Sequence, residues 1–171
     1  MVETKQSFAL EKRLQDLYDA HTERSKLIEW NYYDYLPWEK GSSFTLNPWN
    51  ESQRTLPTEI VTAIETSMLT EINLPWYTAY LKDMFRDGLA PLQGFVHNWV
   101  AEEDQHATAL ENYLVLTRNS DPKELGVLKR EMMVTGWDST FASPIATMGY
   151  TAIQELATVV FYQKIAKSSK E

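Results

Sequence analysis

The sequence has no cysteine and only three histidines among its 171 residues. The absence of cysteine excludes a disulfide framework, a thiolate metal site and a cysteine nucleophile. Any bound metal ion must therefore be held by aspartate, glutamate and histidine side chains. Such ligands favour iron or manganese over structural zinc.

Long apolar runs and an excess of basic residues are also absent. No segment approaches the roughly 18 consecutive apolar residues that suggest a membrane helix. The N-terminal stretch MVETKQSFALEKRLQD lacks the apolar segment of a signal peptide. We therefore expect a cytoplasmic protein without a membrane span. The formal net charge of −8 argues against nucleic acid or an anionic membrane as a partner.

The residues that are present fit one globular, all-α domain over residues 1–171. Hydrophobic residues make up 43% of the chain and aromatic residues 12%, enough for a buried core. Apolar residues recur at helical spacing in five segments, which are residues 6–23, 57–86, 91–118, 122–136 and 144–166. Residues 28–55 keep no such period, which predicts an ordered loop whose Trp and Tyr side chains pack across the bundle.

Some residues near helix ends and inside helices receive structural interpretations. His21 lies near the C-terminal end of the first predicted helix, where an imidazole suits the helix dipole, so we interpret it as a cap. Pro75 removes the backbone N–H that would bond to the Glu71 carbonyl, so the second predicted helix should be kinked there. The turn Asp87-Gly88 should end that helix.

The third predicted helix carries a carboxylate and an imidazole on an otherwise apolar face. Glu103 and His106 share this face with Trp99 and Leu110. An apolar face does not accept an ionised carboxylate unless its charge is compensated. The Glu-x-x-His pair is the inward-facing ligand pair of carboxylate-bridged di-metal helix bundles. On this motif alone, a partly buried ion pair or a hydrogen-bonded core histidine is the simpler explanation.

Two further carboxylates lie on apolar helix faces, and together with Glu103 they favour a metal site over an isolated ion pair. Glu71 shares a face with Ile64, Met68, Leu74 and Thr78, and Glu155 shares one with Met148, Ala152, Val159 and Tyr162. Each inward carboxylate would cost several kcal/mol without compensation. Three of them on three long helices therefore predict a metal site.

Five stretches resemble the soluble acyl-acyl-carrier-protein desaturases, most closely the actinobacterial-type branch. They are WNYYDYLPWEKG, NPWNESQRTLP, TEINLPWY, NWVAEEDQHATALENYLVLTRNSDP and YTAIQELATVVFY, and together they extend through most of the chain. The pattern WxAEExxHxxAL is specific, and we do not expect it by chance in a ferritin or a ribonucleotide reductase.

The resemblance implies a ferritin-like di-iron helical bundle that forms homodimers. It also implies insertion of a cis double bond into a fatty acyl chain held on acyl carrier protein, in fatty acid biosynthesis. The reaction would use dioxygen and two electrons from a ferredoxin-type donor. By position, Glu71 matches a terminal ligand of the first iron, and Glu155 a terminal ligand of the second. Glu103 matches a bridging carboxylate, and His106 the imidazole on the first iron.

The resemblance implies two further roles and a set of tunnel walls. Thr158 matches a threonine beside the oxygen-binding face, which makes it a candidate catalytic residue. Trp30 matches a tryptophan on the side where electrons arrive. The acyl chain would lie in a narrow apolar tunnel beside the metal, so that one carbon pair can react. The candidate wall residues are Leu74, Trp76, Trp99, Met148 and Tyr150, although ordinary core packing is the simpler explanation for each of them.

The chain departs from the family pattern in one respect. The family site uses a second Glu-x-x-His on a fourth bundle helix, whereas the other histidines here are His21 and His97, and His97 lies on a polar helix face. We therefore expect a C-terminally truncated, partial domain that holds one iron or none. An apolar groove should be left where the fourth helix would pack. A second copy of the chain, a swapped element or the polypeptide that would follow Glu171 should cover it.

Three functional readings follow from this departure. The first is a desaturase by family, although we expect the 171 residues alone to give no turnover. The second is a catalytically incomplete fragment or a non-enzymatic helical protein. The third is a ferritin-like iron-binding dimer with a site shared between two chains.

Overall fold

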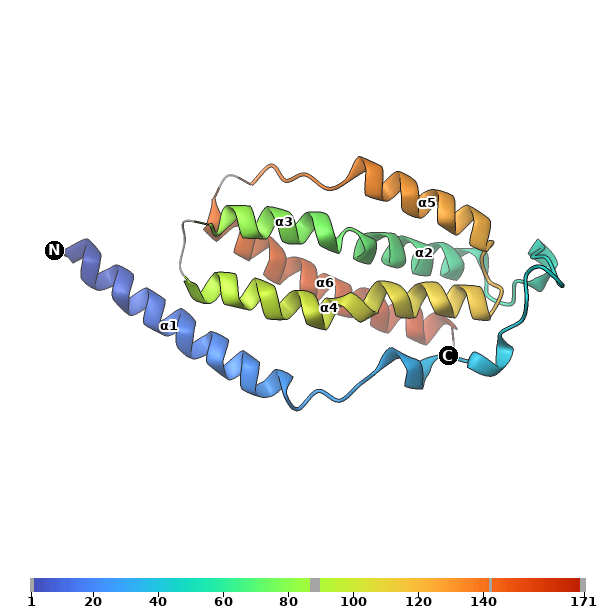
Figure 1. Ribbon diagram of the computed structural model, residues 1–171, viewed down its shortest axis with the longest axis horizontal. Coiled ribbons are helices and arrows are strands. Elements are labelled where there is room, and N and C mark those ends of the chain that lie inside the picture. Colours follow the sequence, from blue (N-terminus) through green and yellow to red (C-terminus); the bar gives the residue numbers. More distant parts are fainter. Residues whose placement is uncertain (1, 87–89, 142, 170–171) are drawn as a thin grey trace.

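The computed structural model describes residues 2–86, 90–141 and 143–169, which form six α-helices and three short 3-10 turns with no strand among them. The helices are α1 (Val2–Ser25), α2 (Thr58–Ile72), α3 (Leu74–Met84), α4 (Ala90–Leu116), α5 (Pro122–Thr135) and α6 (Pro144–Ser169), as Figure 1 shows. The predicted all-α class is therefore confirmed for the described residues. None of the helices in this part of the chain is both long and apolar enough to cross a membrane.

The second predicted helix is divided into α2 and α3 by a break at Asn73. The Asn73 N–H closes α2 on the carbonyls of Glu71 and Thr70, and Pro75 stands in the first turn of α3. A proline has no N–H to donate, so it is tolerated where a helix begins and not where one continues. The predicted kink is thus present as a complete break. The predicted stop at Asp87-Gly88 lies outside the described residues.

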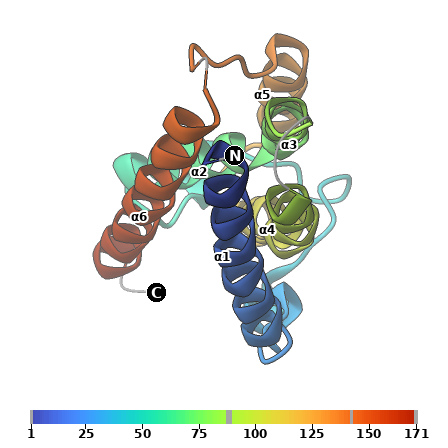
Figure 2. The same ribbon diagram turned by 90° about the vertical axis from the view of Figure 1, so that its left-hand side faces the viewer.

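Helix α4 is the central helix of the bundle. It packs against α1, α2 and α3, while α5 and α6 pack against α2. Figure 1 shows α2 and α3 running along one side of α4, with the N-terminal half of α1 extending beyond the end of the bundle. Figure 2 shows α6 standing apart from α4, with α1 between them in that view.

Two apolar clusters hold the bundle together. The first joins α2, the C-terminal half of α4 and α5 through Leu56, Val61, Ile64, Met68, Leu114 and Leu125. The second joins α3 and the N-terminal half of α4 through Tyr77, Leu81, Phe85, Val96 and Trp99. The break between α2 and α3 falls between the two clusters, so the middle of α4 is the place where polar side chains can point inward.

The irregular segment is ordered as predicted, but its aromatic side chains do not all pack across the bundle. It contains the 3-10 turns η1 (Tyr32–Tyr35), η2 (Trp38–Lys40) and η3 (Glu51–Gln53). Tyr33 stacks on Tyr32 and on Trp38, and Tyr33, Tyr35 and Trp38 are 54, 72 and 45% exposed. The packing prediction was therefore wrong for these three residues, because Tyr33 and Trp38 stack on each other along the loop and Tyr35 packs edge-on against Trp30.

The end of α4 ties the second half of this loop to the bundle. Arg118 adopts a left-handed backbone with φ 56°, and the Asn119 N–H bonds to the Leu114 carbonyl, which is a Schellman ending. Glycine is usual at such a position, but here the Arg118 guanidinium donates to the Ser42 hydroxyl and the Asn47 carbonyl. The strained backbone at Arg118 thus places a side chain that binds the loop.

His21 is not a helix cap. Its Nε2 lies 3.1 Å from Oε1 of Glu102 on α4, and its ring packs edge-on against Phe95. The prediction from the helix dipole was wrong because His21 faces a neighbouring helix that carries a carboxylate. This contact joins α1 to α4.

Candidate metal centre

The four predicted metal ligands and Thr158 all line one cavity of about 600 Å³. Glu71 comes from the last turn of α2, Glu103 and His106 from the middle of α4, and Glu155 from α6. The cavity thus lies where α2, α4 and α6 face one another, beside the break between α2 and α3. The other two histidines do not line it, since His21 pairs with Glu102 and His97 is exposed.

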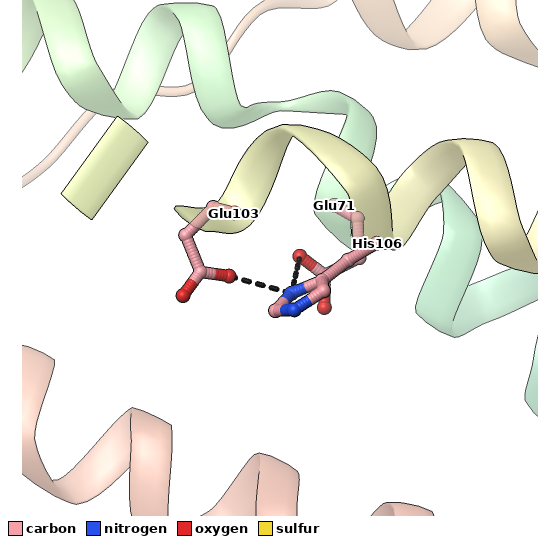
Figure 3. A group of neighbouring side chains, drawn as sticks. All are labelled: Glu71, Glu103 and His106. Atoms are coloured by element: carbon pink, nitrogen blue, oxygen red, sulfur yellow. Dashed lines mark ion pairs between the residues drawn. The ribbon is translucent and has the colours of Figure 1, made fainter. Parts of the chain in front are cut away.

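Glu71, Glu103 and His106 form a compact group. Figure 3 shows the two side chains of α4 and Glu71 of α2 pointing toward one another. Nδ1 of His106 lies 2.7 Å from Oε2 of Glu103 and 3.8 Å from Oε2 of Glu71. One potential ligand atom from each residue lies within 4.8 Å of the others. Such a group can hold one divalent cation through oxygen and nitrogen ligands.

The local sequence of α4 explains why these two side chains point inward. Glu103 and His106 are three residues apart, so they are neighbours on one helix face. Trp99, one turn earlier, is buried in the second apolar cluster, and Leu110, one turn later, packs against the first. The apolar residues on both sides fix the rotation of α4 and therefore the direction of its Glu-x-x-His pair.

Two carboxylates beside Nδ1 of His106 hold its imidazole in the charged form. The hydrogen bond to Glu103, the contact with Glu71 and the charges of both carboxylates raise the pKa of His106 from 6.5 to about 10, although burial opposes this. Without a metal ion, the imidazolium is the cation that compensates the two carboxylates. A metal ion bound at Nδ1 would replace this proton, so binding should release protons and weaken as pH falls.

Glu155 lies on the opposite wall and is kept partly neutral. Burial, followed by the charges of Glu103 and Glu71, raises its pKa from 4.5 to about 7. It does not belong to the compact group of three. A cation in the cavity would reverse this effect, since it would favour the ionised carboxylate.

The ligands at this cavity are of the kinds that iron accepts, and they complete the ligand set of one iron ion better than that of two. Carboxylate oxygens and an imidazole nitrogen are ligands that iron accepts, and three inward carboxylates supply the negative charge that a cation needs. Among the described residues that line the cavity there is one imidazole, His106. Glu71, Glu103 and His106 would hold the first ion, and Glu155 is the carboxylate that the described cavity residues leave for a second.

The raised pKa values of Glu155 and His106 predict how stability depends on pH in the metal-free protein. Each group binds its proton more tightly when folded, so each stabilises the fold most below its unfolded pKa. The contribution of Glu155 is complete below pH 4.5 and lost as pH rises through about 7. The contribution of His106 is complete below pH 6.5 and lost as pH rises through about 10.

Glu155→Gln should therefore raise the melting temperature of the metal-free protein at pH 8 and have little effect at pH 4.5. Because Glu155 is partly exposed, we expect about 1 kcal/mol, or about 2–4 °C. Melting curves recorded from pH 4 to 9 measure the difference between variant and wild type. Glu131→Gln on the exposed face of α5 is the matched control. The same pH-dependent gain in the control would mean that net charge, and not the environment of Glu155, causes the effect.

Several cavity residues were assigned wrongly or missed. Leu74, Trp99 and Tyr150 line the cavity as predicted. Trp76 does not, because it is 43% exposed and its indole N–H donates to the Met133 carbonyl. Met148 lines a second, smaller cavity beside α1. The wall residues that the sequence did not reveal include Asn73, Tyr77, Met132 and Trp137.

The inward face of α6 agrees with the predicted stripe at Glu155, Val159 and Tyr162, which line the cavity, but not at Ala152. Thr147 and Thr151 are buried on this face, and Tyr162 lines the cavity, whereas the predicted stripe residue Ala152 is exposed. Large apolar side chains lie exposed on other faces of α6, among them Ile153 at 72% and Leu156 at 67%. Because α6 is apolar on nearly every side, its periodicity identified the inward face in the second half of the helix but not at Ala152 in the first half.

Trp30 lies directly against the candidate centre. Its ring stacks on the imidazole of His106, with centroids 5.7 Å apart and an interplanar angle of 21°. Trp30 is 37% exposed, so it reaches from the surface to a predicted ligand. Its role in electron transfer stays a prediction.

Comparison with known proteins identifies the family. A family model described as fatty acid desaturase matches residues 6–171. Two putative acyl-[acyl-carrier-protein] desaturases of Mycobacterium tuberculosis are similar to this chain. DesA1 is 32% identical over 154 residues, which cover 83% of this chain and 45% of DesA1. DesA2 is 30% identical over 169 residues, which cover 95% of this chain and 61% of DesA2.

Plant relatives show the same likeness over a similar part of the chain. The seed-specific chloroplastic stearoyl-[acyl-carrier-protein] 9-desaturase of Brassica napus is 30% identical over 151 residues, which cover 83% of this chain and 38% of the plant protein. No solved structure matches significantly. The chain spans about half the length of the curated relatives it matches. Since the family model extends over nearly the whole chain and the described residues fold as the expected helical bundle, this chain belongs to the fatty acid desaturase family.

Proposed function

We propose that this protein is an acyl-acyl-carrier-protein desaturase that inserts a cis double bond into a fatty acyl chain during fatty acid biosynthesis. One observation carries the proposal. The three carboxylates and the imidazole expected of this part of a desaturase site line a single cavity. Dioxygen, two electrons from a ferredoxin-type donor and an acyl chain on acyl carrier protein are the reactants that this function requires.

Each side chain at the cavity has a role under this proposal. Glu71, Glu103 and His106 hold iron, and Glu155 extends the site toward α6. Bound iron would activate dioxygen, which is the oxidant that removes hydrogen from an unactivated methylene group. Thr158 lies on the cavity wall one helical turn after Glu155, where its hydroxyl can donate or accept a hydrogen bond.

The rest of the cavity suits an acyl chain. Its walls include Leu74, Tyr77, Trp99, Leu110 and Trp137, whose apolar and aromatic surfaces exclude water. Its volume of about 600 Å³ lies in the usual range for small-molecule sites, roughly 300–1,000 Å³. An apolar chain in this space would bring its methylene groups next to the four polar ligands.

A ferritin-like iron-binding dimer is the second candidate function. It is favoured by the single imidazole at the cavity and by the exposed apolar surface of α6, which a second copy would cover. In that arrangement two chains would share one site. Iron oxidation without an acyl substrate, together with a stable dimer in solution, would distinguish this function from a desaturase.

Anaerobic reconstitution with ferrous iron tests the proposal. We expect about one tightly bound iron per chain, because the described donors complete the ligand set of one ion more fully than that of two. The chain should also bind acyl carrier protein more tightly when it carries a saturated acyl chain than when it carries none. Turnover is then assayed with acyl-acyl carrier protein and a ferredoxin reducing system.

Each outcome of this experiment has a defined meaning. Absence of iron binding would overturn the metal site, and equal binding of acylated and unacylated carrier protein would overturn the substrate. We expect no unsaturated product from the 171 residues alone. Two irons per chain with an unsaturated product would show that the remaining ligands are supplied by residues other than those identified here.

A further inference from the structure

The two oxygens of the Glu71 carboxylate have different neighbours. Oε1 accepts a hydrogen bond from the hydroxyl of Tyr162, which reaches across from α6 and lines the cavity. Oε2 is the oxygen that faces His106, at 3.8 Å from Nδ1. A tyrosine hydroxyl keeps its proton at neutral pH, so it acts as a donor to the carboxylate.

We propose that Tyr162 is a positioning residue that occupies Oε1 of Glu71 and leaves Oε2 as the oxygen that binds metal. This inference rests on the metal site of the proposed function and adds to it a residue outside the set of ligands. It predicts that Glu71 binds with one oxygen and not two while the hydroxyl of Tyr162 is present.

The physical reason is that a carboxylate can bind a metal with one oxygen or with both. A hydrogen bond to one oxygen fixes the rotation of the group and removes that oxygen from competition. Glu71 stands in the last turn of α2, immediately before the break at Asn73, so few backbone contacts on its C-terminal side restrain it. A bond from another helix therefore has most influence on its orientation.

The position of Tyr162 on α6 also links two walls of the cavity. Tyr162 follows Thr158 by four residues and Glu155 by seven, so the three share one face of α6. All three line the cavity. Helix α6 thus contributes one carboxylate directly and controls a second carboxylate, on α2, through the hydroxyl of Tyr162.

Cobalt(II) substitution tests this inference in the full chain. The visible absorption of Co²⁺ weakens as its coordination number rises. Tyr162→Phe frees Oε1 of Glu71 to bind as a second oxygen, so we expect the molar absorption of the bound Co²⁺ to fall by about twofold or more. In the infrared spectrum, the separation of the two carboxylate stretching bands should narrow, as it does when a carboxylate binds through both oxygens.

Tyr80→Phe is the matched control. The Tyr80 hydroxyl donates to the Phe141 carbonyl and lies 2.8 Å from the Thr147 hydroxyl on α6, so the variant also loses a bond between helices. Tyr80 does not line the cavity. We expect its Co²⁺ spectrum to match that of the wild type, and circular dichroism verifies that both variants are folded.

The outcomes separate this inference from the proposed function. If wild type and Tyr162→Phe bind Co²⁺ with identical visible and infrared spectra, Tyr162 does not position Glu71, although the metal site stands. If Tyr80→Phe produces the same spectral change, the cause is a looser α6, and the inference is again overturned. If the wild type binds no Co²⁺, the metal site itself fails, and this inference fails with it.

Discussion

Replacing Glu103 with glutamine is expected to weaken Fe²⁺ or Co²⁺ binding at the candidate centre strongly. Glu103 is the carboxylate nearest to His106, with Oε2 at 2.7 Å from Nδ1, and it belongs to the compact group of three. Loss of a residue that only supports a ligand typically costs about 10–100-fold in affinity. Loss of a charged ligand should exceed this. Competition against a chelator of known affinity measures the change.

The same substitution has a second readout in the metal-free protein. The hydrogen bond that the His106 ring donates to Glu103 is the largest cause of the raised pKa of His106, which is about 10. An amide in its place carries no charge and therefore stabilises the imidazolium less. The pKa of His106 should fall toward its ordinary value of 6.5, and an NMR titration of the ring measures this shift. A fall in both metal affinity and pKa would connect the two properties to one side chain.

Glu102→Gln is the control for this prediction. Glu102 is the preceding residue on α4, but its carboxylate accepts a hydrogen bond from Ser25 and pairs with His21 on α1. The variant therefore loses the same charge from the same helix without altering the cavity. Equal losses of metal affinity in both variants would show that the net charge of α4, and not the geometry at His106, controls binding.

The neighbouring pair Glu102 and Glu103 also shows why the sequence located the α4 side of the site correctly. Successive helical residues point about 100° apart, so the apolar residues Trp99 and Leu110 assign the inward direction to Glu103. The same reasoning placed Glu71 in line with Met68. Where apolar and polar residues alternate clearly around a helix, side-chain direction follows from the sequence.

The same reasoning was less complete for α6, where apolar and polar residues do not alternate clearly. It placed Glu155 and Tyr162 correctly on the inward face, but it also placed Ala152 there, which is exposed. Between Pro144 and Tyr162, helix α6 has one charged residue, Glu155, and apolar residues lie on several sides of it. In the first half of α6 the inward face carries threonine residues, and Thr147 and Thr151 are buried there. The hydrogen bond from Tyr162 to Glu71 joins residues 91 apart in the sequence, and no local pattern reports such a contact. The packing of α6 against α2 brings these two residues together.

The loop was the other region that the sequence described only in part. Its order was predicted, but the residue that fixes it lies in the turn after α4. Asn119 is completely buried, and its Oδ1 accepts the backbone N–H groups of Thr55 and Leu56, each at 2.9 Å. Its Nδ2 donates to the Thr117 hydroxyl at 2.8 Å, and its carbonyl accepts from Arg54. One side chain thus satisfies two donors that precede α2.

Asn119→Ala should therefore destabilise the protein strongly. The two N–H groups would lose their acceptor, and the one on Leu56 lies beside the first apolar cluster, where water cannot replace it. A buried donor left unsatisfied costs about 1–3 kcal/mol, so we expect the free energy of unfolding to fall by about 2–4 kcal/mol. For a chain of this size that corresponds to a melting temperature about 5–15 °C lower. Thermal and urea unfolding of the metal-free protein measure both quantities.

Asn50→Ala provides the matched control, because it is the same substitution in the same loop. The Asn50 side chain accepts from the Ser52 N–H at 3.1 Å, but it is exposed, so water can take its place. We expect a loss of about 0.5–1 kcal/mol from this cap. If Asn119→Ala costs no more than Asn50→Ala, the loop does not depend on the buried amide. In that case the cation of Arg118, which reaches Ser42 and Asn47, would be the contact that holds the loop to the bundle.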